Sequence, residues 1–449
     1  MLSYLKIRNF KSILDLKLDM SYAERKAPNN HQDSDSLPFL EVDKKNRFVP
    51  VLAIYGANGA GKTTTLEAFG CLQALLAGNR ILRNRKPFNP NKINPKFSDT
   101  RFEISVYINN LNYIYTITYN KTEIVSESFS IQNLESQIKN LFTIINGECN
   151  FDGIATDTYD INKLKDIFKV ECKDNNHQWL PFVSCLERNY SQLSLDITNF
   201  CRYIVKDLMF YDRREFVLPD AVEILAVDDS EQSYQSAFSE ITNELKKFDL
   251  DIEHITMTRQ IRDYLNDGPI SLPRKATFAR RSDDGTFVFD TVSTFHMNIN
   301  NERVAFDFDE ESDGTKTLSV LLGICLFALK NGKTVLVDEL ERSLHPILLK
   351  EIIRMFKSKK YNKTNAQLIF TAHNTDILED NDKIEKDSNN IDNKENYCMR
   401  VSEVAVIDKN KETGSTIIRI SDTNARNVSN FRKRYLNGDY KGLPKIHKQ

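Results

Sequence analysis

The chain has 449 residues, of which 40% are apolar and 28% are charged, and its formal net charge is −2. This length predicts two or three structural units, and the composition supplies enough apolar side chains for a sizeable core. The near-zero net charge argues against a protein that mainly coats nucleic acid, because such proteins carry a basic excess.

Cysteine usage and hydropathy bound the compartment. The seven cysteines are scattered, and no two have the C-x-x-C spacing of a zinc or redox site. We therefore expect free thiols in a reducing compartment. Residues 1–12 lack the features of a signal peptide, and the longest apolar run, Leu318–Leu329, is too short to span a bilayer. A cytoplasmic location without membrane contact is the expectation.

The N-terminal part predicts strands around one glycine-rich turn. Residues 1–20 alternate apolar and polar, which predicts two antiparallel strands, and the polar segment 21–47 predicts a surface loop. Val51–Tyr55 predicts a central strand, and Thr63–Leu76 predicts a helix. Three alternating runs separated by turn residues then predict a β-meander: Phe102–Ile108, Tyr113–Tyr119 and Ile124–Ile131.

The middle of the chain carries no motif. Residues 134–290 are helical and irregular in pattern, with apolar residues at helical spacing between Phe238 and Phe248. We interpret this region as an inserted helical arm or lid. Strands return at Thr286–Thr291 and Val304–Phe308.

The C-terminal part alternates helices and strands. Leu318–Leu329 predicts a buried helix that stops at Asn331-Gly332. Two predicted strands, Thr334–Val337 and Gln367–Thr371, flank a predicted helix at His345–Phe356, and this alternation is typical of a parallel α/β core. The expected division is therefore an N-terminal lobe at 1–133, the insertion at 134–290 and a C-terminal lobe at 291–449.

The turn after the first central strand, Gly56–Thr63, matches the phosphate-binding pattern G-x-x-x-x-G-K-[ST]. Its glycines allow backbone N–H groups to wrap phosphates, and the following helix points its positive end at them. We expect Lys62 to reach the β- and γ-phosphates and the Thr63 hydroxyl to coordinate Mg²⁺. The candidate binding residues here are Gly56, Asn58, Gly59, Ala60, Gly61, Lys62, Thr63 and Thr64.

An apolar strand, Val335–Val337, ends in Asp338 and Glu339. We expect Asp338 to hold Mg²⁺ through water and Glu339 to polarise the attacking water as the general base. On its own the pattern is equally that of an ordinary strand end, and the phosphate-binding turn is what favours a functional role. The long separation between Lys62 and Asp338 predicts that an insertion splits the core.

Two further segments suit a phosphate site. Ser312 and Gly314 precede the apolar helix and offer a hydroxyl and N–H groups at a helix start, although an ordinary N-cap is the alternative. His373 follows the strand Gln367–Thr371 and can donate to a γ-phosphate or hold the attacking water, although a lone histidine is more often structural.

The order of these motifs resembles that of ABC-type ATPases of the RecF/SMC-like branch. Within that branch the chain is similar to AAA-family ATPases of bacterial phage-defence and abortive-infection systems. The matching residues are Asn58, Glu311–Thr315, Asp338-Glu339, Ser343–Pro346 and Thr371–His373, together with Ile7–Ser12 and Tyr435–Tyr440 near the two ends.

The resemblance implies an α/β P-loop NTPase: an ABC-ATPase-like head with an N-terminal antiparallel β subdomain and an inserted helical arm or lid. Ser312 and Gly314 would contact the γ-phosphate held by a second copy, so that ATP is sandwiched in a homodimer or higher oligomer. His373 would be the switch histidine, and Lys11 and Ser12 would lie near the nucleotide.

Three features of the family pattern bear on details. The resemblance implies that Ser343–Pro346 is the D-loop across the dimer interface. It also implies a Q-loop glutamine, for which the sequence offers no clear residue. Glu127 and Gln132 are the two candidates near the expected position.

The resemblance further implies a Mg²⁺-dependent ATPase that acts as a nucleotide-driven switch in antiviral defence and controls a separate effector protein such as a nuclease. The segment after the last strands is too short for a fused nuclease, and no second acidic cluster stands out. The alternative is a DNA-repair or recombination ATPase that grips DNA between dimerised heads. Its contacts would be Arg274, Lys275, Arg280, Arg281 and Arg432–Arg434. An ATPase subunit of a membrane transporter is a third possibility, which the N-terminal strands and the insertion disfavour.

Overall fold

The structure is a computed structural model. It describes residues 1–22, 35–77, 89–156, 159–172, 180–211, 216–228, 230–248, 250–263, 277–281, 286–378, 399–423 and 431–443. The chain forms two compact units. Unit 1 comprises Met1–Phe210, Gly332–Leu340 and Ile353–Gln449, and unit 2 comprises Tyr211–Asn331 and Glu341–Ile352. The three-part division with bounds after 133 and 290 stays a prediction.

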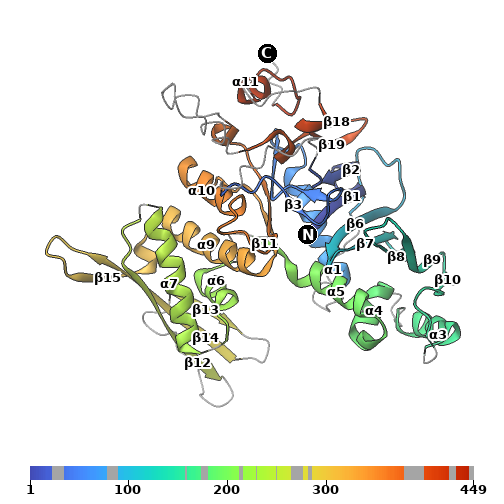
Figure 1. Cartoon of the computed structure of the whole chain (residues 1–449), viewed down its shortest axis with the longest axis horizontal. Helices are drawn as coiled ribbons and strands as arrows, with labels where there is room; N and C mark the ends of the chain where they lie inside the picture. The colour runs from blue at the N-terminus through green and yellow to red at the C-terminus, as the bar shows by residue number, and fades with distance from the viewer. Residues whose placement is uncertain are drawn as a thin grey trace. The chain divides into compact units, whose positions relative to one another are not determined.

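One mixed sheet, of 13 strands within the described ranges, has the order β10-β9-β8-β7-β6-β1-β2-β19-β18-β5-β17-β16-β11 (Figure 1). In chain order the strands are β1 (Leu2–Phe10), β2 (Ile13–Asp19), β5 (Val51–Gly56), β6 (Thr100–Ile108), β7 (Leu111–Tyr119), β8 (Ile124–Gln132), β9 (Ile138–Ile145), β10 (Glu148–Asn150), β11 (Leu208–Tyr211), β16 (Thr334–Val337), β17 (Gln367–Thr371), β18 (Val404–Asn410) and β19 (Gly414–Arg419). A separate short hairpin pairs β3 (Leu40–Glu41) with β4 (Arg47–Phe48).

The parallel part of this sheet forms the centre of unit 1. Strands β18, β5, β17 and β16 run parallel to one another, and every residue of β5, β16 and β17 is buried. Continuous apolar runs of this kind are expected where both faces of a parallel sheet are covered. Because β17 lies between β5 and β16, the residues that follow these three strands meet at one edge of the sheet.

The antiparallel part confirms the predicted hairpin and meander, with β1 paired to β2 and β6, and β7 paired to β6 and β8. It continues into β9 and β10, where the sequence predicted a helical and irregular region. That prediction was incomplete. The exposed residues Ile138, Lys139 and Asn140 interrupt the apolar–polar alternation of β9, so its period of two is hidden in the sequence.

The helices of unit 1 follow the same chain order. They are α1 (Lys62–Ala77), α3 (Ile161–Glu171), α4 (Phe182–Asn189), α5 (Leu195–Arg202), the π-helical turn η2 (Tyr203–Asp207) and α11 (Phe431–Leu436). Single 3₁₀ turns are η1 (Ser191–Leu193), η4 (Asp376–Leu378), η6 (Val401–Glu403) and η7 (Ile420–Asp422). Leu66 and Phe69 of α1 share one buried apolar cluster with Ile54 of β5 and Ile407 of β18, which seats the helix on the sheet.

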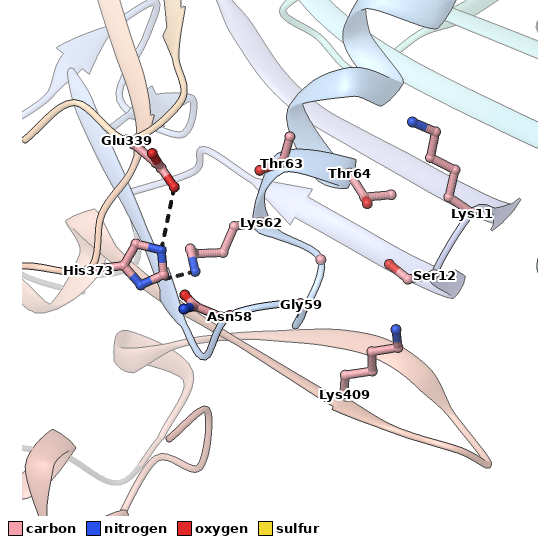
Figure 2. A pocket seen from close by; sticks show the side chains of 11 residues that line it. Lys11, Ser12, Asn58, Gly59, Lys62, Thr63, Thr64, Glu339, His373 and Lys409 are labelled. Atoms are coloured by element: carbon pink, nitrogen blue, oxygen red, sulfur yellow. Dashed lines mark hydrogen bonds and ion pairs between the residues drawn. The ribbon is translucent and has the colours of Figure 1, made fainter. Parts of the chain in front are cut away.

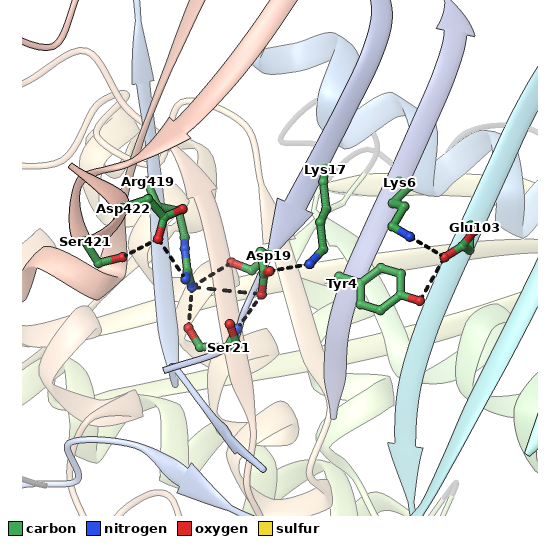
Figure 3. A network of polar contacts seen from close by, with 9 residues as sticks. All are labelled: Tyr4, Lys6, Lys17, Asp19, Ser21, Glu103, Arg419, Ser421 and Asp422. Atoms are coloured by element: carbon green, nitrogen blue, oxygen red, sulfur yellow. Dashed lines mark hydrogen bonds and ion pairs between the residues drawn. The ribbon is translucent and has the colours of Figure 1, made fainter. Parts of the chain in front are cut away.

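A polar network fixes the join between the two parts of the sheet (Figure 3). The Arg419 guanidinium donates to the carbonyl oxygens of Asp19 and Ser21 and to the Asp422 carboxylate. The Asp19 carboxylate in turn accepts from Lys17 at 2.6 Å. These contacts tie the end of β2 to the end of β19, so the opposite ends of the two strands, beside the glycine-rich turn, are also held in place.

Unit 2 has its own sheet of four strands within the described residues: β12 (His254–Asp263), β13 (Phe278–Arg281), β14 (Thr286–Met297) and β15 (Arg303–Asp307). Its helices are α6 (Leu218–Leu225), α7 (Glu231–Lys247) and α9 (Asp313–Asn331), with the 3₁₀ turn η3 (Phe308–Glu310) before α9. The helix α10 (Pro346–Phe356) begins in unit 2 and ends in unit 1.

The predicted buried helix Leu318–Leu329 is confirmed as the centre of unit 2. Within α9 it packs on α6 and α7, as Figure 1 also shows. A Cβ on Gly323 would lie 2.9 Å from the Ala221 Cβ, so the glycine lets α9 and α6 approach closely. Strand β12 was not predicted, because the sequence pattern of its region was interpreted as helical.

Membrane and thiol expectations can be set against the described residues. No described helix is long and apolar enough to cross a bilayer. The six cysteines within the described ranges are all free, as the sequence predicted, and Cys398 lies outside those ranges.

Candidate nucleotide-binding site

The glycine-rich turn lies between β5 and α1 and needs glycine for its backbone. Gly59 and Gly61 have φ of 75° and 115°, in the region that side chains disfavour. A Cβ on Gly61 would also lie 2.5 Å from the Ser415 Oγ and 3.0 Å from the Ser12 Oγ. The turn is therefore pressed between the β1–β2 turn and the start of β19, which leaves room for backbone only.

Lys62, the first residue of α1, lies folded against this turn. Its side chain is largely buried, and its Nζ donates to the carbonyl oxygens of Gly56 at 2.8 Å and Ala57 at 3.2 Å. The same Nζ is 3.4 Å from Nδ1 of His373. A buried ammonium in a ring of carbonyls is poised to bind an anion, because its only compensation comes from partial charges.

The acid pair at the end of β16 faces the start of α1. The Thr63 hydroxyl donates to Oδ2 of Asp338 at 2.8 Å, and the Thr371 hydroxyl donates to Oδ1 at 2.6 Å. The Thr371 Oγ1 also accepts from the backbone N–H of Glu339 at 2.8 Å. Thr371 thus orients both acids, and the two distant stretches of chain come together as the sequence predicted.

Glu339 has an unusual backbone. Its φ is 51°, a left-handed conformation that few residues other than glycine adopt. Its side chain is half exposed, and its Oε1 lies 3.9 Å from Nε2 of His373 (Figure 2). Such strain is found at functional sites when the surrounding structure enforces it. Here it turns the carboxylate into the cavity instead of along the strand.

His373 is held from both sides. The Ala372 N–H donates to the Ile54 carbonyl at 3.1 Å, and the Tyr55 hydroxyl donates to the Asn374 carbonyl at 2.9 Å. Both acceptor and donor residues of β5 precede the glycine-rich turn. The imidazole is therefore fixed relative to that turn by the backbone on either side of it.

These residues surround one cavity of about 400 Å³, and all of its lining residues belong to unit 1. The lining consists of Lys11, Ser12, Asn58, Gly59, Gly61, Lys62, Thr63, Thr64, Glu339, His373 and Lys409 (Figure 2). Gly56 and Asp338 lie directly behind it through their bonds to Lys62 and Thr63. Lys409 is the lining residue that the sequence reasoning missed, because a lysine after an apolar strand has no distinguishing local pattern.

The turn between β1 and β2 contributes Lys11 and Ser12. Lys11 has φ of 50°, and its Nζ forms an ion pair with Oε2 of Glu67 at 2.6 Å. The Ser12 hydroxyl is 2.9 Å from the Ser415 hydroxyl. The structure thus places both predicted residues at the cavity.

The oxygen atoms near the acid pair suit Mg²⁺. The hydroxyl of Thr63 and the carboxylate of Asp338 are hard ligands of the kind Mg²⁺ prefers. Within the described ranges there is no cluster of three or more His, Cys, Asp or Glu side chains that could hold a metal alone. The donor set therefore fits a cation that is bound jointly by a few protein oxygens and the phosphates of a substrate.

Ser312 and Gly314 belong to unit 2, where they open α9. The Ser312 Oγ accepts from the Thr315 N–H at 3.1 Å, which is the N-cap arrangement, and Ser312 is exposed. A Cβ on Gly314 would lie 3.0 Å from the Ser343 carbonyl oxygen, and Ser343 itself has φ of 67°. The helix start and the segment expected to be the D-loop are therefore packed together. The role of both in contacting a second copy stays a prediction.

Neither candidate for the Q-loop lines the cavity. Glu127 is buried on β8, where its carboxylate accepts from the N–H groups of Phe182 and Val183 at 2.7 and 3.0 Å and from the Tyr115 hydroxyl at 3.1 Å. Burial raises the pKa of Glu127 from 4.5 to about 7, against the lowering effect of these bonds. Glu127 therefore holds the start of α4. Gln132 accepts a bond from Asn112 at the end of the same strand.

A glycine-rich turn between a parallel strand and a helix, beside a strand that ends in two acids, defines a P-loop nucleoside triphosphatase. Residues 51–379 match the family described as "AAA domain, putative AbiEii toxin, Type IV TA system". Since this match covers well over half of the chain, the chain belongs to that family and is an ATPase of the ABC/AAA type.

Other comparisons add likenesses in fold. No curated protein matches the chain. The SMC head bound to the C-winged helix domain of ScpA has a TM-score of 0.43 and 11% identity, and the match covers 93% of this chain and 97% of that one. The SMC head domain from Thermotoga maritima has a TM-score of 0.38 and 13% identity, with 93% and 98% covered. The recombination mediator protein RecF with ATP has a TM-score of 0.28 and 11% identity, with 83% and 92% covered.

Proposed function

We propose that the cavity of unit 1 binds ATP with Mg²⁺ and that its acid pair hydrolyses the γ-phosphate. The observation that carries this proposal is the 2.8 Å bond between Thr63 and Asp338. It joins the phosphate-binding turn to the acids of a strand far away in the sequence, with Lys62, Glu339 and His373 on the same cavity.

In the proposed reaction Lys62 and the N–H groups of the turn bind the β- and γ-phosphates. Glu339 accepts a proton from water as the water oxygen bonds to the γ-phosphorus, and the bond between that phosphorus and the β–γ bridging oxygen breaks to release ADP and phosphate. His373 donates a hydrogen bond to a γ-phosphate oxygen. Mg²⁺, held beside Thr63 and Asp338 when bound, neutralises the charge that develops on the phosphates.

The test is nucleotide affinity of a Lys62→Ala variant. We expect Mg-ATP binding, measured by titration calorimetry, to be lost, because the variant removes the buried ammonium that lies within the turn. Lys17→Ala is a matched control, since Lys17 is a lysine of the same unit that lies in the network of Figure 3 and not at the cavity. Undiminished ATP affinity in Lys62→Ala would refute the assignment of this cavity.

We further propose that ATP closes a dimer of two copies. The exposed hydroxyl of Ser312 and the N–H groups that follow it would bind the γ-phosphate held by the other copy, and hydrolysis would remove that bridge. The support is that these groups stand at the start of a long helix, where anions are favoured, and that Ser312 is accessible.

For the biological role we propose an ATPase switch of a bacterial defence system that controls a separate effector protein such as a nuclease. The support is the description of the family, which names a toxin of a toxin–antitoxin system. Purification of the tagged Glu339→Gln chain from its own host, with and without ATP, tests this proposal. A nuclease bound in an ATP-dependent manner supports it, and a chain that carries only DNA refutes it.

The DNA-gripping alternative gains no support from the described basic residues. The Arg432 guanidinium lies 3.1 Å from the Asp376 carboxylate and donates to the Thr375 hydroxyl, and Arg434 pairs with Asp439 at 3.0 Å. Both arginines are thus engaged within the chain. Of the other predicted contacts, Arg274 and Lys275 and the side chain of Arg280 lie outside the described residues. ATP-dependent DNA binding with a steep salt dependence would revive this alternative.

A further inference from the structure

A second cavity, of about 320 Å³, adjoins the first at the glycine-rich turn. The two share Asn58, Gly59 and Lys409, so Lys409 lines both. Its neighbour along the hairpin, Lys411, lines the second cavity but not the first. The two lysines of one hairpin therefore differ in their access to the proposed phosphate site.

Strand pairing explains how Lys409 reaches the turn. Strand β18 runs parallel to β5, with Ile407 opposite Gly56, so the residues after Ile407 continue alongside the turn. Side chains alternate along a strand, which places Lys409 on the face of Ala405 and Ile407. Both of these share the buried cluster of α1. Figure 2 shows the Lys409 side chain extending toward the part of the cavity near Gly59 and Ser12.

The hairpin that carries Lys409 is fixed to the site. The Ser415 N–H donates to the Ser12 carbonyl at 2.9 Å, and a Cβ on Gly414 would lie 2.7 Å from that same carbonyl oxygen. The Asn410 side chain accepts from the N–H groups of Glu412 and Thr413 at 2.9 and 2.6 Å, which closes the tip of the hairpin. Lys409 thus projects from a backbone whose position relative to the glycine-rich turn is set.

The lysines around the first cavity differ in their partners. Lys11 is paired with Glu67, and Lys62 is bonded to the carbonyls of the turn. Lys409 has no hydrogen bond or ion pair to any described residue, and its side chain is exposed. An ammonium that stands beside a phosphate-binding turn and has no carboxylate partner favours an anion there.

We infer that Lys409 is a nucleotide-contacting residue that binds the α- and β-phosphate end of ATP. Glu339 and His373 lie together at the other part of the cavity, where the γ-phosphate would react (Figure 2). This inference rests on the proposed function. It assigns to the C-terminal hairpin a direct part in holding the substrate, in addition to the turn and the β1–β2 connection.

The test is titration of Lys409→Gln with Mg-ATP and, separately, with Mg-ADP, beside the wild type and the matched control Lys411→Gln. We expect the Kd of Lys409→Gln to rise by about tenfold for both nucleotides alike, because ATP and ADP share the α- and β-phosphates. The difference from the wild type should shrink as salt is added. Lys411→Gln should bind both nucleotides as the wild type does.

Two results would overturn the inference while leaving the ATP site in place: unchanged affinity in Lys409→Gln, or a loss confined to ATP, which would move the contact to the γ-phosphate. An equal loss in Lys411→Gln would show a general charge effect and would also overturn it. If Lys62→Ala binds ATP as the wild type does, the proposed function itself fails, and that outcome is distinct from the others.

Discussion

Two helices of this chain begin beside small residues, and they differ in what their first turns hold. In unit 1, α1 begins with the buried Lys62, whose ammonium lies within the glycine-rich turn. In unit 2, α9 begins after the exposed Ser312, whose hydroxyl is occupied by the Thr315 N–H of its own helix. The first turn is built to receive phosphate within one chain, whereas the second is complete without a ligand. This contrast suggests that the second turn acts only when another copy brings the phosphate.

The largest effect is expected at the base that serves the first turn. Glu339→Gln should lower the ATPase rate by about 10²–10⁴-fold, because the amide cannot accept the proton of water. Binding of Mg-ATP should persist, since Lys62, Thr63 and Asp338 are unchanged. Steady-state phosphate release and titration with ATP measure the two properties. A rate within about twofold of the wild type would assign the base to another residue.

Ser312→Arg should separate the two turns. The larger side chain should block contact with a second copy, so turnover should fall by at least about tenfold while a single copy still binds ATP. In a Glu339→Gln background, where we expect ATP to trap a dimer, sedimentation velocity should show dimer for the parent and monomer for the double variant. An ATP-dependent dimer that survives Ser312→Arg would break the contrast between the helices.

A pair of glycine substitutions sharpens the same contrast. Gly61→Ala should reduce ATP affinity, because alanine is strained at φ of 115° by at least about 1 kcal/mol and meets Ser415. Gly314→Ala meets only the Ser343 carbonyl, at 3.0 Å, and should lower turnover while ATP affinity is retained. Titration and turnover on both variants decide the matter. Loss of affinity in Gly314→Ala would contradict the assignment of that turn to a second copy.

The smallest effect concerns stability and not the site. Since the pKa of Glu127 is raised from 4.5 to about 7, the folded chain favours its protonated form. The stabilisation is fully present below pH 4.5 and is lost as pH rises through 7. Wild type should therefore lose up to about 3 kcal/mol from this group between about pH 5 and pH 8, as measured by urea unfolding.

Two variants isolate this contribution. Glu127→Gln should be less stable at both pH values, because its amide faces N–H donors, and its stability should change less with pH. Glu123→Gln, an exposed neighbour in the turn before β8, should keep the full pH dependence. An identical fall in stability in Glu127→Gln and the wild type would place the titrating group elsewhere.

The sequence predicted those parts of the molecule whose signals are local. The turn from Gly56 to Thr63, the strand before Asp338 and the apolar helix α9 are each marked by a motif or an unbroken apolar run. Lys409 was missed because its importance depends on the pairing of β18 with β5, which no local pattern reveals. Strands β9 and β12 were missed because polar residues on exposed faces obscure their alternation.

The most direct measurement is a crystal structure of the Glu339→Gln chain with Mg-ATP. The account predicts that the triphosphate lies along the turn from Gly59 to Thr63, with its metal nearest the Thr63 hydroxyl and the Asp338 carboxylate. A nucleotide bound at another surface, with the space between Lys62 and the acid pair filled by protein alone, would contradict it.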